Sequence, residues 1–591
     1  MKQDQPSNMQ LTSRLLFRLL PVQFFLALVS SVNGIVSSLF ASNYVGVEAM
    51  TAVGIYNPIN MLIGALSLML VGGATILCGK FIGRNEPEKV QSVFSLSNLL
   101  CVAIAALFIV LFLIFGIFDL TGFLAKDPAI RPIFNKYLVG QSFGVLPLLI
   151  GNQLASFLSL ENQVKRTTFA SFVYMIVNVI LNYLFVCRWH MEAFGLALAS
   201  SIGLWVFVLI QAQFFVSKDA PLKLFSQNMI WKESLEIVKI GIPGAASNAY
   251  QTLRGLIVNE LLTVFVGSIG ISAFTAADTL LRIWWALPTG MVAVSRMLIS
   301  ISIGEEDKQT LTDVMRNMFR RFLPLMSVIC VATILSAKPL ALLYYQDTTQ
   351  PVYMMTVWGF RILPICMPLS IICMHFICYA QASGKQVLVH LLSVLDGVVC
   401  VAGFTAILIR SLGMNSLYIA NVLNGVVTTI VIIVYAMIRN KKMPRNMAEL
   451  MVVPSDFGVA KENRMDLSIK NMAEVVTVAK EVQAFCKEQG IDSKRSYLAG
   501  LFLEEMAGNV VDHGFHKDKK KHSVDIRVVH KEDDVILRIK DDCVPFNPQE
   551  RSQIVDPEDI AKNIGIRMVY KMTDRIEYQN ILGLNVLTIR I

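Results

Sequence analysis

The chain has 591 residues, of which 54% are hydrophobic and only 16% are charged. This composition excludes a purely soluble protein, because soluble domains carry about 25% charged residues. The net charge of +9 does not indicate nucleic-acid binding, because most of the basic excess lies in loops between apolar segments, and no nucleic-acid partner is expected. Charged residues are dense after Arg439 and sparse before it, which predicts a membrane part followed by a soluble part.

Long apolar segments fill the chain before Arg439. Twelve of them are long enough to cross a bilayer as helices, which takes about 20 residues. Lys and Arg residues concentrate in alternate loops and after Arg439, so the positive-inside rule places those loops and both termini in the cytoplasm. We therefore expect a multi-pass protein in the lipid bilayer of a bacterial-type plasma membrane. The predicted spans are residues 15–40, 51–78, 91–118, 132–158, 166–187, 193–216, 236–265, 273–303, 317–343, 353–381, 387–409 and 416–438.

Two stretches of the first six spans recur in the second six. VGVEAMTAVG, from Val45, is similar to IGISAFTAAD, from Ile269, and FIGRNEPEK around Gly83 parallels SIGEEDKQT around Gly304. Each match follows the corresponding helix, and six crossings return the chain to its starting side. The two halves are therefore expected to be parallel repeats about an axis along the membrane normal, with a binding site between them. The expected boundaries are 1–232 for the N-lobe and 233–440 for the C-lobe.

These features resemble the multidrug and toxin extrusion (MATE) family over about residues 10–440. The resemblance is carried by the repeat of six spans, the VGVEAMTAVG segment, the IGRNEPEK loop, and Asn178 and Asn182 in NVILNYLFV. It implies two six-helix lobes, twelve transmembrane helices in all, and a cation- or proton-coupled efflux antiporter that exchanges a small-molecule substrate for H⁺ or Na⁺. The chain has no P-loop GxxxxGK[ST], so ATP is not expected to power transport.

The N-lobe interior carries amides in place of acids. Asn33 stands where the family often has an aspartate, and an amide cannot exchange protons. Asn178 and Asn182 belong to the same set, and each is a candidate cavity residue or equally a source of interhelical hydrogen bonds. The absence of acids inside this lobe favours a receptor over a transporter, whereas the repeat of six spans favours a transporter.

The C-lobe carries ionisable side chains inside its predicted spans, where they are costly and indicate function. Asp278 and Arg282 are four residues apart on one helix face and could simply neutralise each other. Glu260 and Asp396 are then the candidates for proton or cation coupling. Four arginines against three acids indicate a substrate with an anionic group rather than a simple lipophilic cation. The ionisable residues are Arg254, Glu260, Asp278, Arg282, Arg296, Arg361 and Asp396.

The chain after Arg439 divides into a linker and a soluble domain. Residues 441–464 contain Pro444 and Pro454 without clear periodicity and are predicted to be the linker. Residues 465–591 show alternating and helical patterns in the order βααββαββ, which indicates a helix layer on a mostly antiparallel sheet. The expected fold class is therefore an all-α polytopic membrane protein joined to a C-terminal α/β two-layer sandwich.

Three short motifs of the soluble domain place polar residues where a nucleotide could bind. LFLEEMAGNVVDHGF puts Glu505 and Asn509 on one helix face, where an amide oxygen suits Mg²⁺ and a carboxylate can deprotonate a nucleophile. RIKDDCVPFNP puts Asp541 at a strand end, where it can accept a hydrogen bond from an adenine amino group. NIGIRMV puts Gly565 at a helix start, which attracts phosphate.

Together these motifs resemble the GHKL ATP-binding fold, and most of all its anti-sigma-factor type of serine kinase. The resemblance implies ATP and Mg²⁺ as cofactors, and it implies serine/threonine kinase activity toward a STAS-like or sigma-factor-like cytoplasmic partner. The implied roles are general base for Glu505, Mg²⁺ ligand for Asn509, and nucleotide binding for Asn509, Asp541, Gly565 and His513.

Two residues depart from the GHKL pattern. Cys543 stands where a D-x-G element has glycine, and Asn563 stands at the first glycine of a G-x-G element. Glycine permits φ > 0 and close backbone approach, which Asn tolerates moderately and Cys poorly. Weakened ATP binding, or a degenerate domain that only binds a partner, is therefore an open alternative. The basic run from Lys517 to Lys521 is interpreted as a solvated loop.

Two functions from different classes follow from these patterns. The first is a MATE-like secondary active transporter whose cytoplasmic nucleotide-binding domain regulates it. The second is a membrane ligand receptor that signals through a GHKL serine/threonine kinase domain. A flippase for lipid or polysaccharide precursors is a third, weaker reading.

Overall fold

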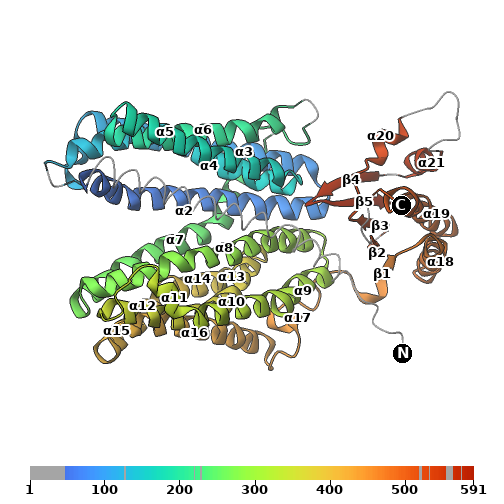
Figure 1. The fold of residues 1–591 in the computed structure, drawn as a ribbon. Coiled ribbons are helices and arrows are strands. Elements are labelled where there is room, and N and C mark those ends of the chain that lie inside the picture. Colours follow the sequence, from blue (N-terminus) through green and yellow to red (C-terminus); the bar gives the residue numbers. More distant parts are fainter. Residues whose placement is uncertain are drawn as a thin grey trace.

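The computed structural model describes residues 47–591 except 126–127, 218–219, 226–228, 518–521, 532, 554–563 and 574. Within these residues, helices form two lobes, and a five-stranded sheet with helices follows at the C-terminus (Figure 1). The predicted fold class is therefore confirmed. The first predicted span, residues 15–40 with Asn33, lies outside the described residues.

Each lobe is built from helices that are apolar over most of their length. Ten helical spans in the described part of the chain are long and apolar enough to cross a membrane. The predicted span at 236–265 is also a helix, α7, but α7 is less apolar than these ten. The N-lobe helices are α2 Val47–Arg84, α3 Pro87–Ile117, η2 Leu120–Phe123, α4 Arg131–Leu160, α5 Val164–Asn182, η3 Tyr183–Arg188 and α6 Glu192–Val216.

The C-lobe repeats the order of the N-lobe but has more interruptions in its helices. Two of its predicted spans contain a turn of π-helix, a form that is often found at functional sites. The C-lobe helices are α7 Lys232–Phe265, α8 Ser268–Gly304, α9 Lys308–Asn317, η4 Met318–Phe322, α10 Leu323–Leu335, α11 Ala337–Leu342, α12 Pro351–Ile362, η5 Leu363–Ile365, α13 Cys366–Ala382, α14 Gln386–Val394, η6 Leu395–Val399, α15 Cys400–Leu412 and α16 Asn415–Asn440.

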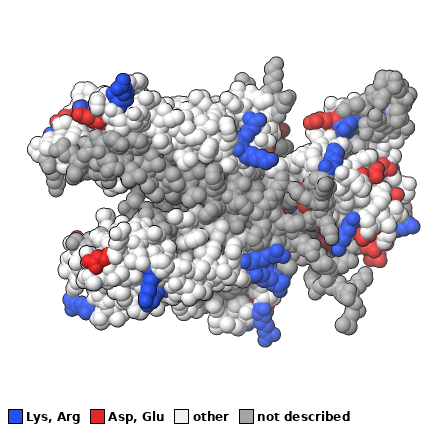
Figure 2. Space-filling view, viewed as in Figure 1, with Lys and Arg blue, Asp and Glu red and all other residues white. Residues whose placement is uncertain are grey.

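The two lobes touch most closely through glycines of α2, α7 and α8. A Cβ atom added at Gly73 would overlap a backbone carbonyl of α7, and one added at Gly304 would overlap the Lys80 carbonyl of α2. Only glycine allows backbones to approach this closely. The Gly304 contact lies near the soluble domain, and Figure 2 shows the surface hollowed between the lobes at the opposite end. The lobes are therefore closed beside the soluble domain and open away from it.

The soluble domain is a single antiparallel sheet with two long helices on one face (Figure 1). The strand order is β1-β2-β3-β5-β4, and every pairing is antiparallel, as predicted. Asn471 and Asp492 accept backbone N–H groups at the starts of the two helices, which fixes where they begin. The elements are β1 Arg464–Ile469, α18 Met472–Glu488, α19 Ser493–Asn509, η8 Val510–Gly514, β2 Val524–Lys531, β3 Asp534–Asp541, α20 Pro548–Ser552, α21 Ile564–Met572, β4 Arg575–Ile581 and β5 Leu584–Arg590.

The predicted linker lies against the C-lobe rather than free of it. It contains α17 (Met447–Leu450) and η7 (Lys461–Asn463). The Lys385 ammonium donates hydrogen bonds to the carbonyl oxygens of Met451, at 2.7 Å, and Val452, at 2.6 Å. Met451 is buried in the apolar core of the helical lobes. The soluble domain is therefore fixed to the C-lobe before its first strand begins.

Candidate functional site

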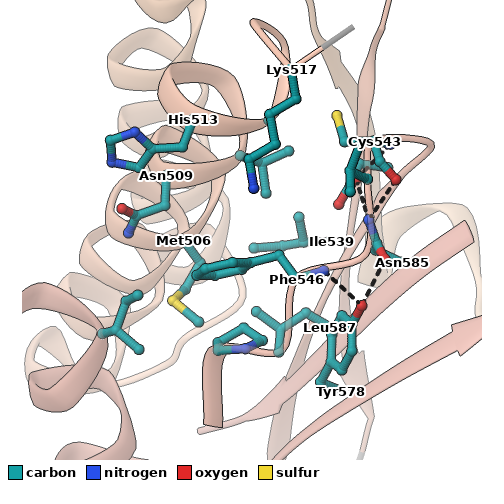
Figure 3. Close-up of a pocket in the computed structure, with 16 residues that line it drawn as sticks. Met506, Asn509, His513, Lys517, Ile539, Cys543, Phe546, Tyr578, Asn585 and Leu587 are labelled. Atoms are coloured by element: carbon teal, nitrogen blue, oxygen red, sulfur yellow. Dashed lines mark hydrogen bonds between the residues drawn. The ribbon is translucent and has the colours of Figure 1, made fainter. Parts of the chain in front are cut away.

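A pocket opens in the soluble domain between the end of α19 and the strands β3, β4 and β5 (Figure 3). It holds about 590 Å³ of space, open to solvent. Apolar side chains form most of its walls, and a few polar groups converge on one side, which is typical of small-molecule sites. The lining residues are Met506, Asn509, Val510, His513, Gly514, Lys517, Ile539, Asp541, Cys543, Val544, Phe546, Pro548, Ile566, Tyr578, Asn585 and Leu587.

The buried carboxylate of Asp541, at the end of β3, is the main charged group inside the pocket. Its Oδ1 accepts hydrogen bonds from the Asn585 side-chain amide at 2.7 Å and from the Cys543 N–H at 3.0 Å. Burial raises the pKa of the Asp541 carboxyl, and these two hydrogen bonds partly counter that effect. Asp541 can therefore accept a further donor, such as the exocyclic amino group of a purine.

A small hydrogen-bond network connects this carboxylate to β4. Asn585 Oδ1 accepts from the Tyr578 hydroxyl at 2.7 Å and from the Asn580 amide at 2.7 Å. The Tyr578 hydroxyl in turn accepts the Phe546 N–H at 3.2 Å (Figure 3). Burial raises the pKa of Tyr578 to about 12, so the hydroxyl is neutral and keeps its proton at physiological pH.

Glu505 and Asn509 lie on α19 as the four-residue spacing predicts. The Asn509 side-chain N–H donates to the Glu505 carbonyl at 2.6 Å, which leaves the amide oxygen as an acceptor at the pocket. A Cβ atom added at Gly565 would overlap the Glu505 carboxylate, so the carboxylate lies directly against the backbone at the start of α21. The structure thus brings the predicted base and the predicted phosphate-binding glycine into contact.

A second polar cluster lies inside the C-lobe around Asp396. Asp396 is in the π-helical turn η6, and its carboxylate accepts from the Asn424 amide of α16 at 2.8 Å. The Arg254 guanidinium of α7 donates to the Asp396 carbonyl at 3.2 Å. One acid, one amide and one guanidinium from three helices therefore meet in this lobe.

The comparisons with protein families separate the chain into the same two parts. Residues 21–184 match the MatE family model, and residues 470–591 match the model described as histidine kinase-like ATPase domain.

The chain joins a MATE domain to a histidine kinase-like ATPase domain.

Curated relatives support the first part. A probable multidrug resistance protein NorM of Bacillus subtilis (strain 168) is 25% identical over 244 residues, which cover 39% of this chain and 52% of that protein. Protein DETOXIFICATION 31 of Arabidopsis thaliana is 27% identical over 213 residues, which cover 35% of this chain and 40% of that protein. The chain thus spans about half the length of the curated relatives it matches.

Solved structures share the fold of the MATE domain. A MATE protein in complex with MaL6 superposes with a TM-score of 0.67 at 20% identity, covering 75% of this chain and 98% of that one. A MOP superfamily transporter from Pyrococcus furiosus Vc1 superposes with a TM-score of 0.66 at 19% identity, covering 73% and 96%. At these identities the likeness establishes the fold.

The ATPase domain places its five predicted residues in two groups. Asn509, Asp541 and His513 line the pocket, and His513 is exposed at the end of η8. Glu505 and Gly565 lie beside each other next to it. Their catalytic and binding roles stay predictions, and Asn563 lies outside the described residues.

Cys543 does not have the strained backbone that the glycine pattern suggested. Its φ is not positive, and its buried side chain packs 3.1 Å from where a Cβ atom of Gly514 would lie. The expectation that cysteine would strain the turn is therefore wrong for this position, because the turn is closed by the Cys543 N–H bond to Asp541 and not by a left-handed residue.

Sequence reasoning missed Tyr578 and Asn585 as pocket residues. Tyr578 and Asn585 come from the last two strands, far along the chain from the other lining residues, and no motif marks them. Their signal was the strand alternation, which places Asn585 and the buried Leu587 on one face of β5. Lys517 is exposed in a loop, as the solvated-loop interpretation expects, and it also lines the pocket (Figure 3).

Among its described ionisable candidates, the MATE domain brings Arg254 and Asp396 together. Glu260 is exposed on α7, and Asp278 is half-buried on α8. The Arg361 guanidinium stacks 5.2 Å from the Trp358 ring centre. Arg282 falls within α8, and its side chain is outside the described part of the structure.

The N-lobe amides Asn178 and Asn182 are both buried and bonded to each other. Asn182 Nδ2 donates to the Asn178 side-chain oxygen at 2.5 Å, and Asn178 Nδ2 donates to Ser200 of α6 at 3.4 Å. One of these bonds is interhelical, as the packing interpretation predicts, whereas the Asn182 side-chain oxygen has no hydrogen-bond partner within the described residues.

Proposed function

We propose that this protein is a MATE-like secondary active transporter, a cation- or proton-coupled efflux antiporter, with a cytoplasmic nucleotide-binding regulatory domain. The observation that carries the proposal is the pair of helical lobes, closed against each other beside the ATPase domain and open at the other end. Two lobes in this arrangement suit alternating access to a site between them. In this proposal both termini lie in the cytoplasm of a plasma membrane.

The coupling ion, H⁺ or Na⁺, would bind at Asp396. This residue is the acid of the described C-lobe that contacts both an amide of α16 and a guanidinium of α7. A π-helical turn at this position lets a side chain leave the regular helix pattern, a common feature of functional sites. Glu260 is the alternative carboxylate.

The substrate would be a small molecule that carries an anionic group. Arg254 and Arg361 are half-buried in the C-lobe, and the described N-lobe interior offers amides such as Asn178. The transporter from Pyrococcus furiosus is described as having a binding pocket of reverse polarity that suggests a different function, so this fold accommodates more than one pocket charge.

In the ATPase domain the pocket would hold ATP, with Asp541 at the adenine amino group. The apolar walls fit a planar base, and Asn509 offers an amide oxygen for Mg²⁺. Bound ATP with Mg²⁺ would supply a transferable phosphoryl group, and Glu505 would act as the general base. A STAS-like or sigma-factor-like partner would be its substrate if the domain acts as a kinase.

Flux in sealed proteoliposomes tests the proposal. We expect gradient-dependent transport of anionic test substrates, lost in Asp396→Asn and retained in Glu505→Ala, with Asn421→Ala on α16 as a matched control because its amide bonds only within its own helix. Gradient-driven transport of ethidium-like cations, with no transport of anionic substrates, would overturn the substrate assignment. The alternative function, a receptor kinase, would be favoured by a chain that shows no flux but phosphorylates a partner protein, provided that Glu505→Ala abolishes the phosphorylation.

A further inference from the structure

The sheet of the ATPase domain is covered on both faces, although a two-layer sandwich leaves one face free. The first six residues of β2, Val524 to Val529, are all buried. Successive strand residues point to opposite faces, so burial without alternation means that both faces are covered. Helices α18 and α19 cover one face, and the MATE domain covers the other (Figure 1).

The C-lobe contact consists of buried ion pairs with the loop that follows α8. Arg527 of β2 pairs with Asp307 at 2.5 Å, and Lys540 of β3 pairs with Glu305 at 2.7 Å. All four side chains are at most 14% exposed. Burial opposes ionisation of Asp307, but Arg527 and Lys540 outweigh it and hold the pKa of the Asp307 carboxyl well below its usual value. This contact therefore consists of oppositely charged side chains that are largely buried.

The N-lobe contact is made by the tip of the β4–β5 hairpin, residues 581–584. The Leu582 N–H donates to the Leu160 carbonyl at the end of α4, at 3.0 Å. The Leu582 side chain is 1% exposed and belongs to the apolar core of the MATE domain. Beside it, the Gln579 amide donates to Asn85 Oδ1 at 2.9 Å. This contact has no ion pair among the described residues, although the Arg575 guanidinium donates to the Asn85 carbonyl at 3.4 Å, and it is formed by a hairpin rather than by the centre of the sheet.

The two contacts use equivalent positions of the two repeats. Asn85 and Glu306 both lie two residues after the aligned glycines of the FIGRNEPEK and SIGEEDKQT loops, and both have left-handed backbones, with φ of 62° and 55°. Asn85 accepts from Gln579, and Glu306 pairs with Lys531 at 2.9 Å. One rigid sheet therefore joins the matching loops of both lobes at their closed end.

The nucleotide pocket reaches the N-lobe contact through the same hairpin. Asn585, one residue beyond the tip, holds together Asp541, Tyr578 and Asn580 by hydrogen bonds of 2.7 Å each. An adenine amino group that donates to Asp541 would bind the same carboxylate that accepts the Asn585 hydrogen bond. A ligand in the pocket thus acts on the base of the hairpin whose tip is docked on α4.

From this arrangement we infer that the ATPase domain is a clamp that holds the two lobes closed on the cytoplasmic side, and that nucleotide in the pocket loosens its N-lobe contact. The C-lobe contact and the linker anchor the domain, and the hairpin is the part that releases. The inference rests on the proposed function in one respect, that transport needs the closed ends of the lobes to separate.

Crosslinking of two matched cysteine pairs in the full chain tests the clamp. The N-lobe pair is Asn85→Cys with Gln579→Cys, and the C-lobe pair is Glu306→Cys with Lys531→Cys. The loop residue has a left-handed backbone in both pairs, so both variants carry the same strain. The half-buried Cys187 is replaced by Ser, because the other nine native cysteines are buried. A short bis-maleimide is added to vesicles with and without a non-hydrolysable ATP analogue and Mg²⁺.

We expect both pairs to crosslink without nucleotide, and the analogue to slow only the N-lobe pair, by about fivefold or more, which is the lower end of usual coupling between sites. Asp541→Asn should remove this effect of the analogue. Failure of either pair to crosslink, absence of binding of a fluorescent ATP analogue, or equal slowing of both pairs would overturn the clamp.

Flux in the same vesicles separates the clamp from the transport function. Crosslinking the N-lobe pair should lower flux by about tenfold or more, whereas crosslinking the C-lobe pair should leave it unchanged. Unchanged flux with the N-lobe pair crosslinked would overturn the clamp. A nucleotide-sensitive crosslink in a chain that transports nothing would instead reject the transporter and leave the nucleotide-controlled docking in place.

Discussion

The loops that end α2 and α8 occupy equivalent places in the two repeats and differ in chemistry. The N-lobe loop offers the amide and carbonyl of Asn85 to the ATPase domain, and the C-lobe loop offers Glu305, Glu306 and Asp307. The same difference holds inside the described lobes. The N-lobe has buried amides such as Asn178, whereas the C-lobe has the polar cluster around Asp396. A repeat can therefore keep its geometry while one copy becomes an anchor and the other a weaker, releasable contact.

The C-lobe anchor should be the more costly contact to break. Arg527→Met removes the ion pair of the buried Asp307, whose carboxylate then keeps its hydrogen bonds at the start of α9. The loss should weaken docking by about 2 kcal/mol or more, as for other truncated buried charge pairs. The rate of C-lobe pair crosslinking measures this loss. Arg527→Lys is the milder control, because a lysine keeps the charge but not the planar fork. Equal crosslinking in wild type and Arg527→Met would show that the two contacts do not differ in strength.

Docking of the hairpin tip on the N-lobe should depend on one apolar side chain. Leu582→Ala removes a leucine that is buried in the MATE domain core and should weaken N-lobe docking by about 2 kcal/mol. The N-lobe pair should then crosslink more slowly while the C-lobe pair does not change. Leu582 has φ of 56°, so Leu582→Gly tests whether backbone relief offsets the lost side chain. Slowing of both pairs would contradict a contact that is local to the hairpin.

The pocket should lose nucleotide affinity when its carboxylate becomes an amide. Asp541→Asn presents an N–H₂ group or a neutral oxygen to the adenine amino group, which should cost about 1–2 kcal/mol, or roughly five- to thirtyfold in Kd. Titration with a fluorescent ATP analogue measures it. Asp542→Asn is the matched control, since the Asp542 carboxylate instead bonds His522. An equal loss in both variants would argue against Asp541 as the adenine contact.

The exposed ion pair of the anchor should contribute little. Lys531 and Glu306 are 48% and 46% exposed, so Lys531→Gln should change docking by less than about 1 kcal/mol. The effect of this substitution should shrink further at a salt concentration of roughly 0.5–1 M, because salt screens the attraction between exposed charges. An effect as large as that of Arg527→Met would mean that the buried pair is not the main source of anchoring.

Anchoring should not change with pH between about 8 and 5. The folded-state pKa of Asp307 is depressed, so its contribution is complete above the unfolded value of about 3.9 and is lost only as pH falls through the lower folded value. The charged groups that face the pair are Lys540, Asp466 and Glu305. The expected result is a constant ratio between crosslinking of the C-lobe pair and maleimide labelling of a single-cysteine variant at each pH, because this ratio corrects for the falling thiolate fraction. A loss near pH 6 would show that another group controls the contact.

Much of the local structure could be predicted from the sequence because each element leaves a local signature. Span length predicts α2 to α16, alternation predicts β1 to β5, and the four-residue spacing predicts that Glu505 and Asn509 share a helix face. The pocket was only partly predicted. Its Asp541 follows a strand, but Tyr578 and Asn585 reach the site through strand pairing, which no local pattern specifies.

The sequence by itself determined the two domains, the repeat of the lobes and a few residues of the nucleotide pocket, namely Asn509, His513 and Asp541, because spacing and hydropathy act within a few turns of helix or strand. Only the tertiary structure decided how the domains meet. Arg527 and Asp307 are 220 positions apart, and Leu582 and Leu160 are 422 apart, so their contacts depend on the completed packing of both domains. Strand β2 is buried on both faces because the sheet packs against the lobes, and this burial follows from the contact between the two domains.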